Sequence, residues 1–357
     1  MAEINRNLLE EDAAYVAALP LPWERLANKR ILISGASGMI GSFLIRVLLK
    51  RKENIQIVAL GRTTEKAKIS LGEFLNWNDF TFISHDINLP LPKIGKMDFM
   101  IHAASNTHPK AYASEPVGTI TANVLGTLNM LEHAVRNGVE RFLFASSVEI
   151  YGESTGCQDY FDEASCGYID CNTMRAGYPE SKRTGEALCQ AYRSQYGIDV
   201  VIARLARTYG PTMLWEDTKA ISQFIKNGCC REDIILKSEG TQFYSYNYVA
   251  DAVSGLLTIL LKGEEGQAYN IADPASDITL KDLAGIIARE AGTKVIFRFP
   301  DQNEAAGYSR ATRAVMSARK LNDLGWYANW DIKSGVQRTL DILKIERQRK
   351  QDDCTVL

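Results

Sequence analysis

The chain has 357 residues, enough to bury a substantial core in one or two domains, and its formal net charge of −2 gives no general attraction to nucleic acid or to an anionic membrane. No apolar run reaches the ~18–20 residues that a membrane span needs, and no cleavable signal pattern precedes the first apolar positions. The seven cysteines include no CxxC pair, so we expect no metal site and no disulfide framework, and the features together predict a cytoplasmic protein.

Residues 1–28 are expected to form a helical leader. Apolar residues recur at roughly helical spacing between positions 8 and 19, and the prolines at 20 and 22 end the pattern. Trp23 and Leu26 are expected to dock this leader on the body of the protein.

Three glycines spaced three apart follow a short apolar run at 31–33 and precede an apolar helical pattern. This order predicts a buried strand, a tight turn and a helix N-terminus, where backbone N–H groups and the helix dipole can hold a diphosphate. Gly35 allows the reversal, Gly38 the close approach of backbone to phosphate, and Gly41 close packing of helix on strand. A glycine-rich turn without a ligand is the alternative. The expected cofactor contacts here are Gly35, Ser37, Gly38, Met39 and Ile40.

A second strand, expected at 55–60, ends in Gly61–Arg62–Thr63 without a carboxylate. In an NAD-binding unit an acidic residue usually ends this strand and binds the ribose hydroxyls. Arg62 could instead pair with a 2′-phosphate, which favours NADP. The alternative is that Arg62 stacks on adenine with NAD bound, so the cofactor is expected to be NAD or NADP.

The third and fourth strands are expected at 81–83 and 99–101. A side chain just after the third strand often faces the adenine edge, although Asp86 could equally be a surface residue. Small residues after the fourth strand leave room for a cofactor, and His102 is either a packing residue or part of the site. The cofactor contacts expected after these strands are Asp86, Ile87, Ala103, Ala104 and Ser105.

A polar cluster follows the fifth strand, expected at 141–145, and it lies where ligands bind in parallel α/β sheets. Downstream, Tyr178 and Lys182 are four residues apart and therefore share one helix face. An ammonium group beside a phenol favours the phenolate, so Lys182 is expected to lower the pKa of Tyr178 and make it a general acid/base. Ser147 could hydrogen-bond the same substrate oxygen.

Together these motifs resemble the extended short-chain dehydrogenase/reductase family, in its NAD-dependent epimerase/dehydratase branch. The resemblance implies a Rossmann-like α/β fold with a doubly wound parallel sheet and a smaller α/β substrate-binding lobe. It also implies a nicotinamide cofactor, a nucleotide-sugar substrate and a homodimer built on two helices per subunit. The matching residues are Gly35, Gly38, Gly41, 102–104, Asn123, Ser147, 151–152, Tyr178, Lys182, 204–211, 248–251 and 324–326.

By position in the family, Tyr178 is the acid/base, Lys182 tunes it and Ser147 orients the substrate hydroxyl. Asn123 is expected to support Lys182 through a water. The implied division of the chain is a leader at 1–28, a cofactor-binding domain at 29–205 and 246–272, a substrate lobe at 206–245 and 273–344, and a flexible tail at 345–357.

The segments 160–163 and 175–178 resemble UDP-glucuronate decarboxylases most. Glu149 matches an acidic residue that these enzymes share with sugar-nucleotide dehydratases, where it is the base at C5. The dehydratase acid that precedes it is replaced by Val148, which cannot transfer a proton. Arg207 replaces a common substrate-contacting Asn, and Tyr244 replaces a common pyrophosphate-binding Arg. The expected substrate contacts are Thr107, Glu149, Arg207, Tyr244, Arg310 and Arg313, although the three arginines could equally be solvated.

Three functions remain open at this point. The first is an enzyme that uses tightly held NAD as a temporary hydride store, oxidising the sugar at C4 before epimerisation or decarboxylation. The second is a net NADPH-dependent reductase of a nucleotide-linked keto sugar, for example a CDP-ketose reduced to a CDP-alditol. The third is a non-catalytic nucleotide-sensing module, which the retained Tyr178 and Lys182 disfavour.

Overall fold

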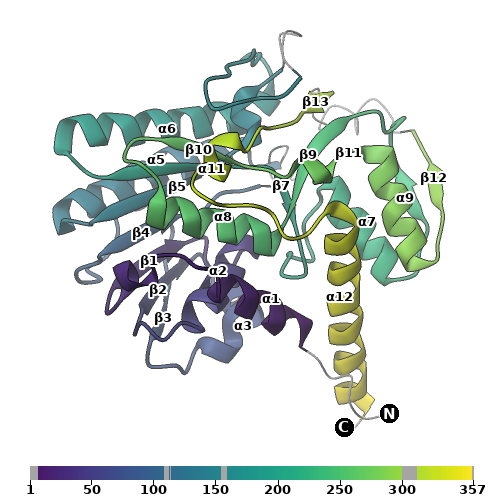
Figure 1. Ribbon diagram of the computed structural model, residues 1–357, viewed down its shortest axis with the longest axis horizontal. Coiled ribbons are helices and arrows are strands. Elements are labelled where there is room, and N and C mark those ends of the chain that lie inside the picture. The colour runs from purple at the N-terminus through teal and green to yellow at the C-terminus, as the bar shows by residue number, and fades with distance from the viewer. Residues whose placement is uncertain (1–6, 108–111, 113, 154–158, 300–311, 356–357) are drawn as a thin grey trace.

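The structure is a computed structural model that describes residues 7–107, 112, 114–153, 159–299 and 312–355. Its centre is a seven-stranded sheet in the order β10-β6-β5-β4-β1-β2-β3 (Figure 1). Every neighbouring pair in this sheet is parallel. The predicted doubly wound parallel sheet is therefore confirmed. The strands are β1 (Arg30–Ser34), β2 (Gln56–Gly61), β3 (Phe80–Ser84), β4 (Phe99–His102), β5 (Arg141–Ser147), β6 (Val200–Leu205) and β10 (Ala268–Ile271).

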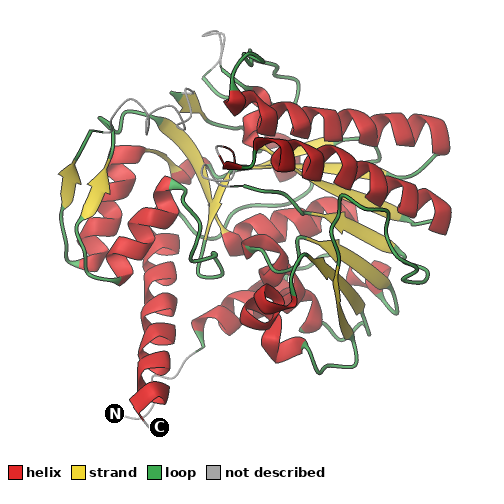
Figure 2. Ribbon diagram, turned by 180° about the vertical axis from the view of Figure 1, so that it is seen from behind, coloured by secondary structure: helices red, strands yellow, loops and turns green. Residues whose placement is uncertain are grey.

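Both faces of this sheet are buried, because apolar residues occupy both sides of its strands. In β1, Ile31 and Ile33 pack into one hydrophobic cluster and Leu32 packs into another. The first cluster includes residues of α2 (Met39–Leu49) and α8 (Val249–Lys262), and the second includes residues of α5 (Pro116–Asn137) and α6 (Gly177–Tyr196). The paired helices α5 and α6 run side by side over their face (Figures 1 and 2).

The strand order reverses between β1 and β4, because the chain runs outward to β2 and β3 and then crosses back to β4. In open α/β sheets, ligands bind beyond the carboxyl ends of the strands at such a reversal. The glycine turn after β1 and the small residues after β4 both lie at this point.

A smaller lobe is built around β9 (Phe243–Tyr248), which pairs in parallel with β7 (Arg207–Tyr209) and β13 (Arg313–Ala314) and antiparallel with β11 (Asp277–Thr279). After β9, helix α8 and strand β10 return the chain to the main sheet. The other elements of the chain are α3 (Thr64–Leu71), α7 (Ala220–Cys229), β8 (Ile234–Leu236), α9 (Leu280–Ala291), β12 (Val295–Phe297) and α11 (Arg319–Asn322).

The buried carboxylate of Asp12 connects the leader to the C-terminal helix. The leader forms α1 (Leu8–Ala17), and Asp12 in it accepts a hydrogen bond from Tyr248 Oη at 2.6 Å and pairs with Arg338 of α12 (Ile332–Thr355). Trp23 and Leu26 are buried, as expected of docking residues. The residues expected to form a tail continue α12 as far as Thr355, since no glycine or proline interrupts the chain after Gly335.

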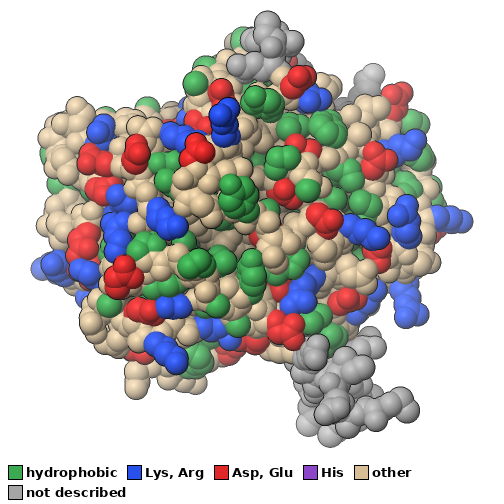
Figure 3. Space-filling view, viewed as in Figure 1, with side chains coloured by type: hydrophobic (Ala, Val, Ile, Leu, Met, Phe, Trp, Pro, Cys, Tyr) green, Lys and Arg blue, Asp and Glu red, His purple; other side chains and the backbone are tan. Residues whose placement is uncertain are grey.

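The face shown in Figure 3 carries acidic and basic side chains interspersed, with no large area of one sign. This mixture agrees with 41 Lys and Arg residues set against 43 Asp and Glu residues. Among the residues that the structure describes, no helix combines the length and apolarity needed to cross a bilayer.

Asp251, near the start of α8, should make stability depend on pH. It is buried and accepts hydrogen bonds from the backbone N–H groups of Asn329 at 2.8 Å and Trp330 at 3.0 Å. Burial raises its pKa from 3.8 to about 7. Between roughly pH 4 and pH 7 the folded state therefore binds more protons than the unfolded chain, and the free energy of unfolding should fall as pH rises through that window.

Urea unfolding midpoints measured from pH 4 to pH 8 check this dependence. The variant Asp251→Asn removes the titration and should flatten the slope, while losing one backbone acceptor at every pH. The exposed Asp323→Asn is the control and should keep the wild-type slope. An unchanged slope in Asp251→Asn would contradict the assignment.

Candidate active site

The turn after β1 has the shape of a phosphate cradle. Gly35 has φ +73°, and a Cβ there would lie 2.6 Å from the Ala103 carbonyl carbon. A Cβ at Gly41 would lie 2.3 Å from the Gly35 carbonyl oxygen. Helix α2 begins at Met39 with Gly38 as its N-cap, so no side chain bonds the first N–H groups and no acidic residue lies in the first turn. An uncapped helix N-terminus beside a backbone that only glycine permits fits the diphosphate of a dinucleotide.

The expected adenosine side of the cofactor site is only partly supported. Arg62 Nη2 donates to Asn106 Oδ1 at 3.1 Å, so the guanidinium is held beyond the carboxyl ends of β2 and β4. The pairing of Arg62 with the 2′-phosphate of NADP stays a prediction. Asp86 is exposed, and its carboxylate accepts from the backbone and side chain of Asn88, which closes its own turn. Ile87 is buried, and its carbonyl accepts from Asn129 of α5.

Small, half-buried residues follow β4, as a cofactor site requires. Ala103 and Ala104 continue the strand end, and Ala104 N donates to Ser34 Oγ at 3.3 Å. Ser105 bonds the carbonyl of its neighbour Asn106. Thr107 is exposed, and its carbonyl accepts a hydrogen bond from Lys219 Nζ at 3.4 Å.

His102 is a packing residue. Its ring is buried between Ser34 Oγ at 2.7 Å and Thr127 Oγ1 at 3.1 Å. Burial, together with the charge of Lys182, lowers its pKa to about 3, so the ring is neutral at physiological pH. A neutral ring with both nitrogens occupied is not available for acid/base chemistry.

The predicted catalytic residues come together at the end of β5. Tyr178 and Lys182 lie on the first turns of α6, and the Tyr178 hydroxyl is hydrogen-bonded to Ser147. Lys182 Nζ donates to the Ala145 carbonyl at 2.8 Å. Asn123 of α5 is buried and donates to Ser181 Oγ at 2.8 Å, and its Oδ1 has no hydrogen-bond partner among the described residues. Asn123 Oδ1 is therefore free to accept a hydrogen bond from a water, and the support of Lys182 through a water stays a prediction.

The pKa values of Tyr178 and Lys182 correct one expectation from the sequence. Burial raises the pKa of Tyr178 to about 12, against the opposing effects of the Ser147 hydrogen bond and the Arg175 charge. Burial also lowers the pKa of Lys182 to about 8. The expected net lowering of the Tyr178 pKa by Lys182 is therefore wrong for the polypeptide alone, because removing the phenolate from water outweighs every favourable charge nearby.

Beside Tyr178, two arginines converge on Glu149. Arg175 Nη2 lies 2.8 Å from one carboxylate oxygen of Glu149, and Arg207 Nη2 lies 3.6 Å from the other. Among the described residues, Arg175 Nε and Nη1 and Arg207 Nη1 are buried without a hydrogen-bond partner. Two cations around one anion, with donors unused, suit a further anionic group.

An aromatic ring packs against each of the two arginines. Arg207 Cζ lies 3.6 Å from the centroid of the buried Tyr244 ring, so the two departures from the family pattern contact each other. Arg175 Cζ lies 4.7 Å from the Tyr112 ring centroid, and that ring packs 4.9 Å from the Tyr178 ring. Such contacts fix a guanidinium without using its N–H groups.

Arg313, another of the expected substrate contacts, makes its hydrogen bond away from this cluster. Arg313 is exposed and donates to the Asp159 carbonyl at 2.8 Å, while Arg310 lies outside the described residues. Conversely, Arg175 and Tyr112 were not predicted as site residues. Two signals pointed to Arg175: it comes three residues before Tyr178, in the short 3-10 helix Met174–Ala176 that leads into α6, and it lies in the segment 175–178 that resembles UDP-glucuronate decarboxylases.

Comparison with known proteins places this site in a family. A profile of the NAD dependent epimerase/dehydratase family matches residues 31–272. The chain belongs to that family. It is therefore an enzyme of the extended short-chain dehydrogenase/reductase type, and NAD is the cofactor that the family uses. When bound, NAD supplies reversible hydride transfer, and the turn at 35–41 is the part of this chain that fits its diphosphate.

Its relatives include nucleotide-sugar enzymes. UDP-glucuronic acid decarboxylase 5 of Arabidopsis thaliana is 37% identical over 258 residues, covering 72% of this chain and 73% of the relative. UDP-glucuronic acid decarboxylase 6 of the same plant is 33% identical and covers 87% of each chain. A dTDP-glucose 4,6-dehydratase of Streptomyces venezuelae, solved with NAD, shares the fold with a TM-score of 0.79 at 24% identity, over 90% of this chain and 98% of that one.

Proposed function

We propose that this enzyme decarboxylates a nucleotide-diphosphate hexuronate, with UDP-glucuronate as the first candidate, and that Tyr178 is its acid/base. The decarboxylases among its relatives support the reaction, at 37% and 33% identity. Epimerisation of the same substrate is the neighbouring possibility within the family. The nucleotide and the sugar are both part of the proposal.

The observation that carries the proposal is the convergence of Arg175 and Arg207 on Glu149. A hexuronate brings a carboxylate to the site, in addition to its diphosphate. Glu149 alone would repel that carboxylate, but two guanidinium groups leave the cluster net positive. Their unpartnered N–H groups are the donors that a second carboxylate would use.

The chemistry follows from oxidation at C4, for which bound NAD is the hydride acceptor. We assign Tyr178, hydrogen-bonded to Ser147, to removal of the C4 hydroxyl proton. Ser147 and the charge of Arg175 both favour its phenolate. The resulting 4-keto acid can lose CO₂, because the electron pair of the C5–carboxylate bond passes into the enolate. Glu149 is the group we assign to proton return at C5, where it relays a proton taken up from water, since Val148 cannot transfer a proton.

The test uses the protein as purified, with UDP-glucuronate and no added cofactor. Mass spectrometry should detect a UDP-pentose and released CO₂ over many turnovers, because the hydride taken at C4 is returned to it. A product of unchanged mass would point to epimerisation instead. Turnover only with stoichiometric NADPH would overturn the proposal in favour of a net reductase.

A homodimer and a cytoplasmic location belong to the same proposal. Helices α5 and α6 pack against each other, and α5 exposes 71% of Val117 and 41% of Leu125 to solvent. Large exposed apolar side chains on a helix pair are suited to a second copy of the chain. Light scattering after size-exclusion chromatography measures the mass that decides this.

A further inference from the structure

Glu186 of α6 contacts the end of β5 at Ser146, which lies between Ala145 and Ser147. Lys182 bonds the Ala145 carbonyl and Tyr178 bonds Ser147, so Ser146 lies between the two residues that these side chains use. Ser146 is buried and its Oγ donates to Glu186 Oε1 at 2.5 Å. Glu186 therefore ties the helix that carries Tyr178 and Lys182 to the strand that orients them.

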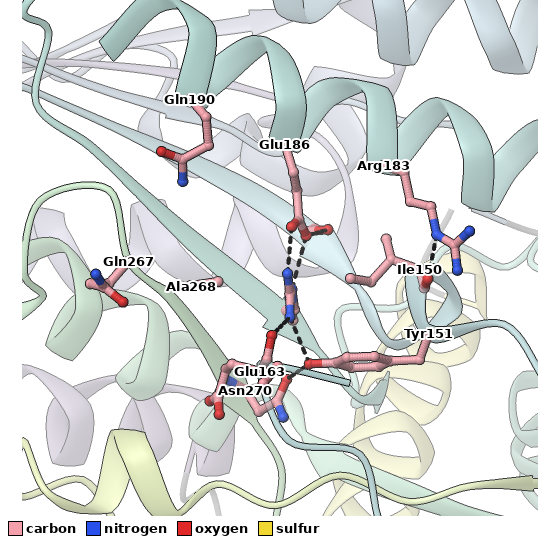
Figure 4. Close-up of polar contacts among 12 residues, drawn as sticks. Ile150, Tyr151, Glu163, Arg183, Glu186, Gln190, Gln267, Ala268 and Asn270 are labelled. Carbon is pink, nitrogen blue, oxygen red and sulfur yellow. Dashed lines mark hydrogen bonds and ion pairs between the residues drawn. The ribbon is translucent and has the colours of Figure 1, made fainter. Parts of the chain in front are cut away.

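The Glu186 carboxylate is itself held by Arg204 of β6. Arg204 Nε lies 3.1 Å from Oε1 and Nη2 lies 2.7 Å from Oε2, a two-pronged ion pair in which each side chain is only 12% exposed. Arg204 Nη1 also donates hydrogen bonds to Tyr151 Oη at 3.0 Å and to the Glu163 carbonyl at 2.8 Å. Figure 4 shows this group of contacts, in which Tyr151 Oη also meets Asn270 Oδ1.

The network also sets the charge around Lys182. The titratable groups that face the ammonium are Glu186 and Cys189 on α6 and His102 on β4. His102 is neutral, and burial raises the pKa of the Cys189 thiol, so both are uncharged at neutral pH. Glu186 follows Lys182 by four residues on the same face of α6, so it is the anion of this set that stabilises the Lys182 cation against burial.

We propose that Glu186 is a positioning residue of the catalytic site, which holds the end of β5 in place through Ser146 and keeps Lys182 protonated. Its effect on turnover rests on the function proposed above, whereas its effect on Lys182 does not. Two variants separate the two roles. Glu186→Gln keeps the side-chain shape and an acceptor but removes the charge, and Ser146→Ala removes the hydrogen bond but keeps the charge.

Two measurements are made on each variant: the pH profile of kcat, and the titration of the Lys182 ammonium by NMR of carbon-labelled lysine, assigned with Lys182→Arg. In Glu186→Gln the Lys182 titration and the basic limb of kcat should both move about one unit lower, since an opposite charge has been removed. Ser146→Ala should lower kcat by about tenfold without moving either titration. The control is Glu265→Gln, which removes the exposed ion pair of Glu265 with Arg193 of α6 and should change neither readout.

The NMR titration tests the role of Glu186 independently of the proposed function. A wild-type protein that does not decarboxylate UDP-glucuronate would overturn the proposed function, while a lowered Lys182 titration in Glu186→Gln would still support the inference. An unmoved Lys182 titration in a folded Glu186→Gln would overturn it. So would a Ser146→Ala variant with wild-type kcat, since the strand end would then not need Glu186.

Discussion

Replacing Tyr178 with phenylalanine is expected to lower kcat by about 100- to 10,000-fold, the range over which positioned acid/base groups contribute to turnover. The substitution removes the hydroxyl that bonds Ser147 and leaves the ring that packs 4.9 Å from Tyr112. KM for UDP-glucuronate and the thermal midpoint should therefore stay near their wild-type values. Steady-state kinetics and differential scanning fluorimetry check both parts.

Tyr196→Phe is the matched control for this prediction. Tyr196 is the last residue of the same helix, and its side chain is 53% exposed. It should leave kcat unchanged. A Tyr178→Phe variant that keeps wild-type turnover would remove this residue from the chemistry and reopen the non-catalytic alternative.

The second large effect is expected at Gly41. A Cβ there would lie 2.3 Å from the Gly35 carbonyl oxygen and 2.9 Å from the Ala36 Cα, both backbone atoms that cannot rotate away. Gly41→Ala should push the α2 N-terminus off β1 and cost about 1–3 kcal/mol of stability. Since the same turn is the proposed phosphate cradle, the variant should also lose its bound NAD.

The thermal midpoint and the NAD released on denaturing the purified protein measure these two losses. Gly285→Ala, in the middle of α9, is the control, because among the described residues no atom lies within 4 Å of its added Cβ apart from its chain neighbours and the backbone of its own helix. That variant should be about 0.5–1 kcal/mol more stable, as alanine is a better helix former than glycine. A Gly41→Ala variant with wild-type midpoint and NAD content would contradict the packing argument.

The elements that carry the site could be predicted because their signals are local. The apolar run, glycine spacing and helical periodicity at 31–49 each act within a few residues, and β1, the turn and α2 form as predicted. The i,i+4 spacing likewise places Tyr178 and Lys182 on one helix face without knowledge of any neighbour. The order of these motifs along the chain then sufficed to place them at the carboxyl ends of parallel strands.

The electrostatics and the supporting contacts could not be predicted in the same way. Arg204 meets Glu186 only because β6 and α6 pack against each other, and Arg207 meets Tyr244 only because β7 pairs with β9. Nothing in the spacing of these residues along the chain indicates that they touch. The pKa of Tyr178 was misjudged for the same reason, since burial depends on what covers a side chain.

The sequence by itself indicated the first five strands of the main sheet, the glycine turn after β1 and the shared helix face of Tyr178 and Lys182, because each depends on backbone geometry and side chains close together in the chain. Only the tertiary structure decided that Arg175 and Arg207 share Glu149, and that Glu186 links α6 to the end of β5. Those contacts join residues far apart in sequence, and their strength comes from a desolvated site that exists only once the sheet and its helices have assembled.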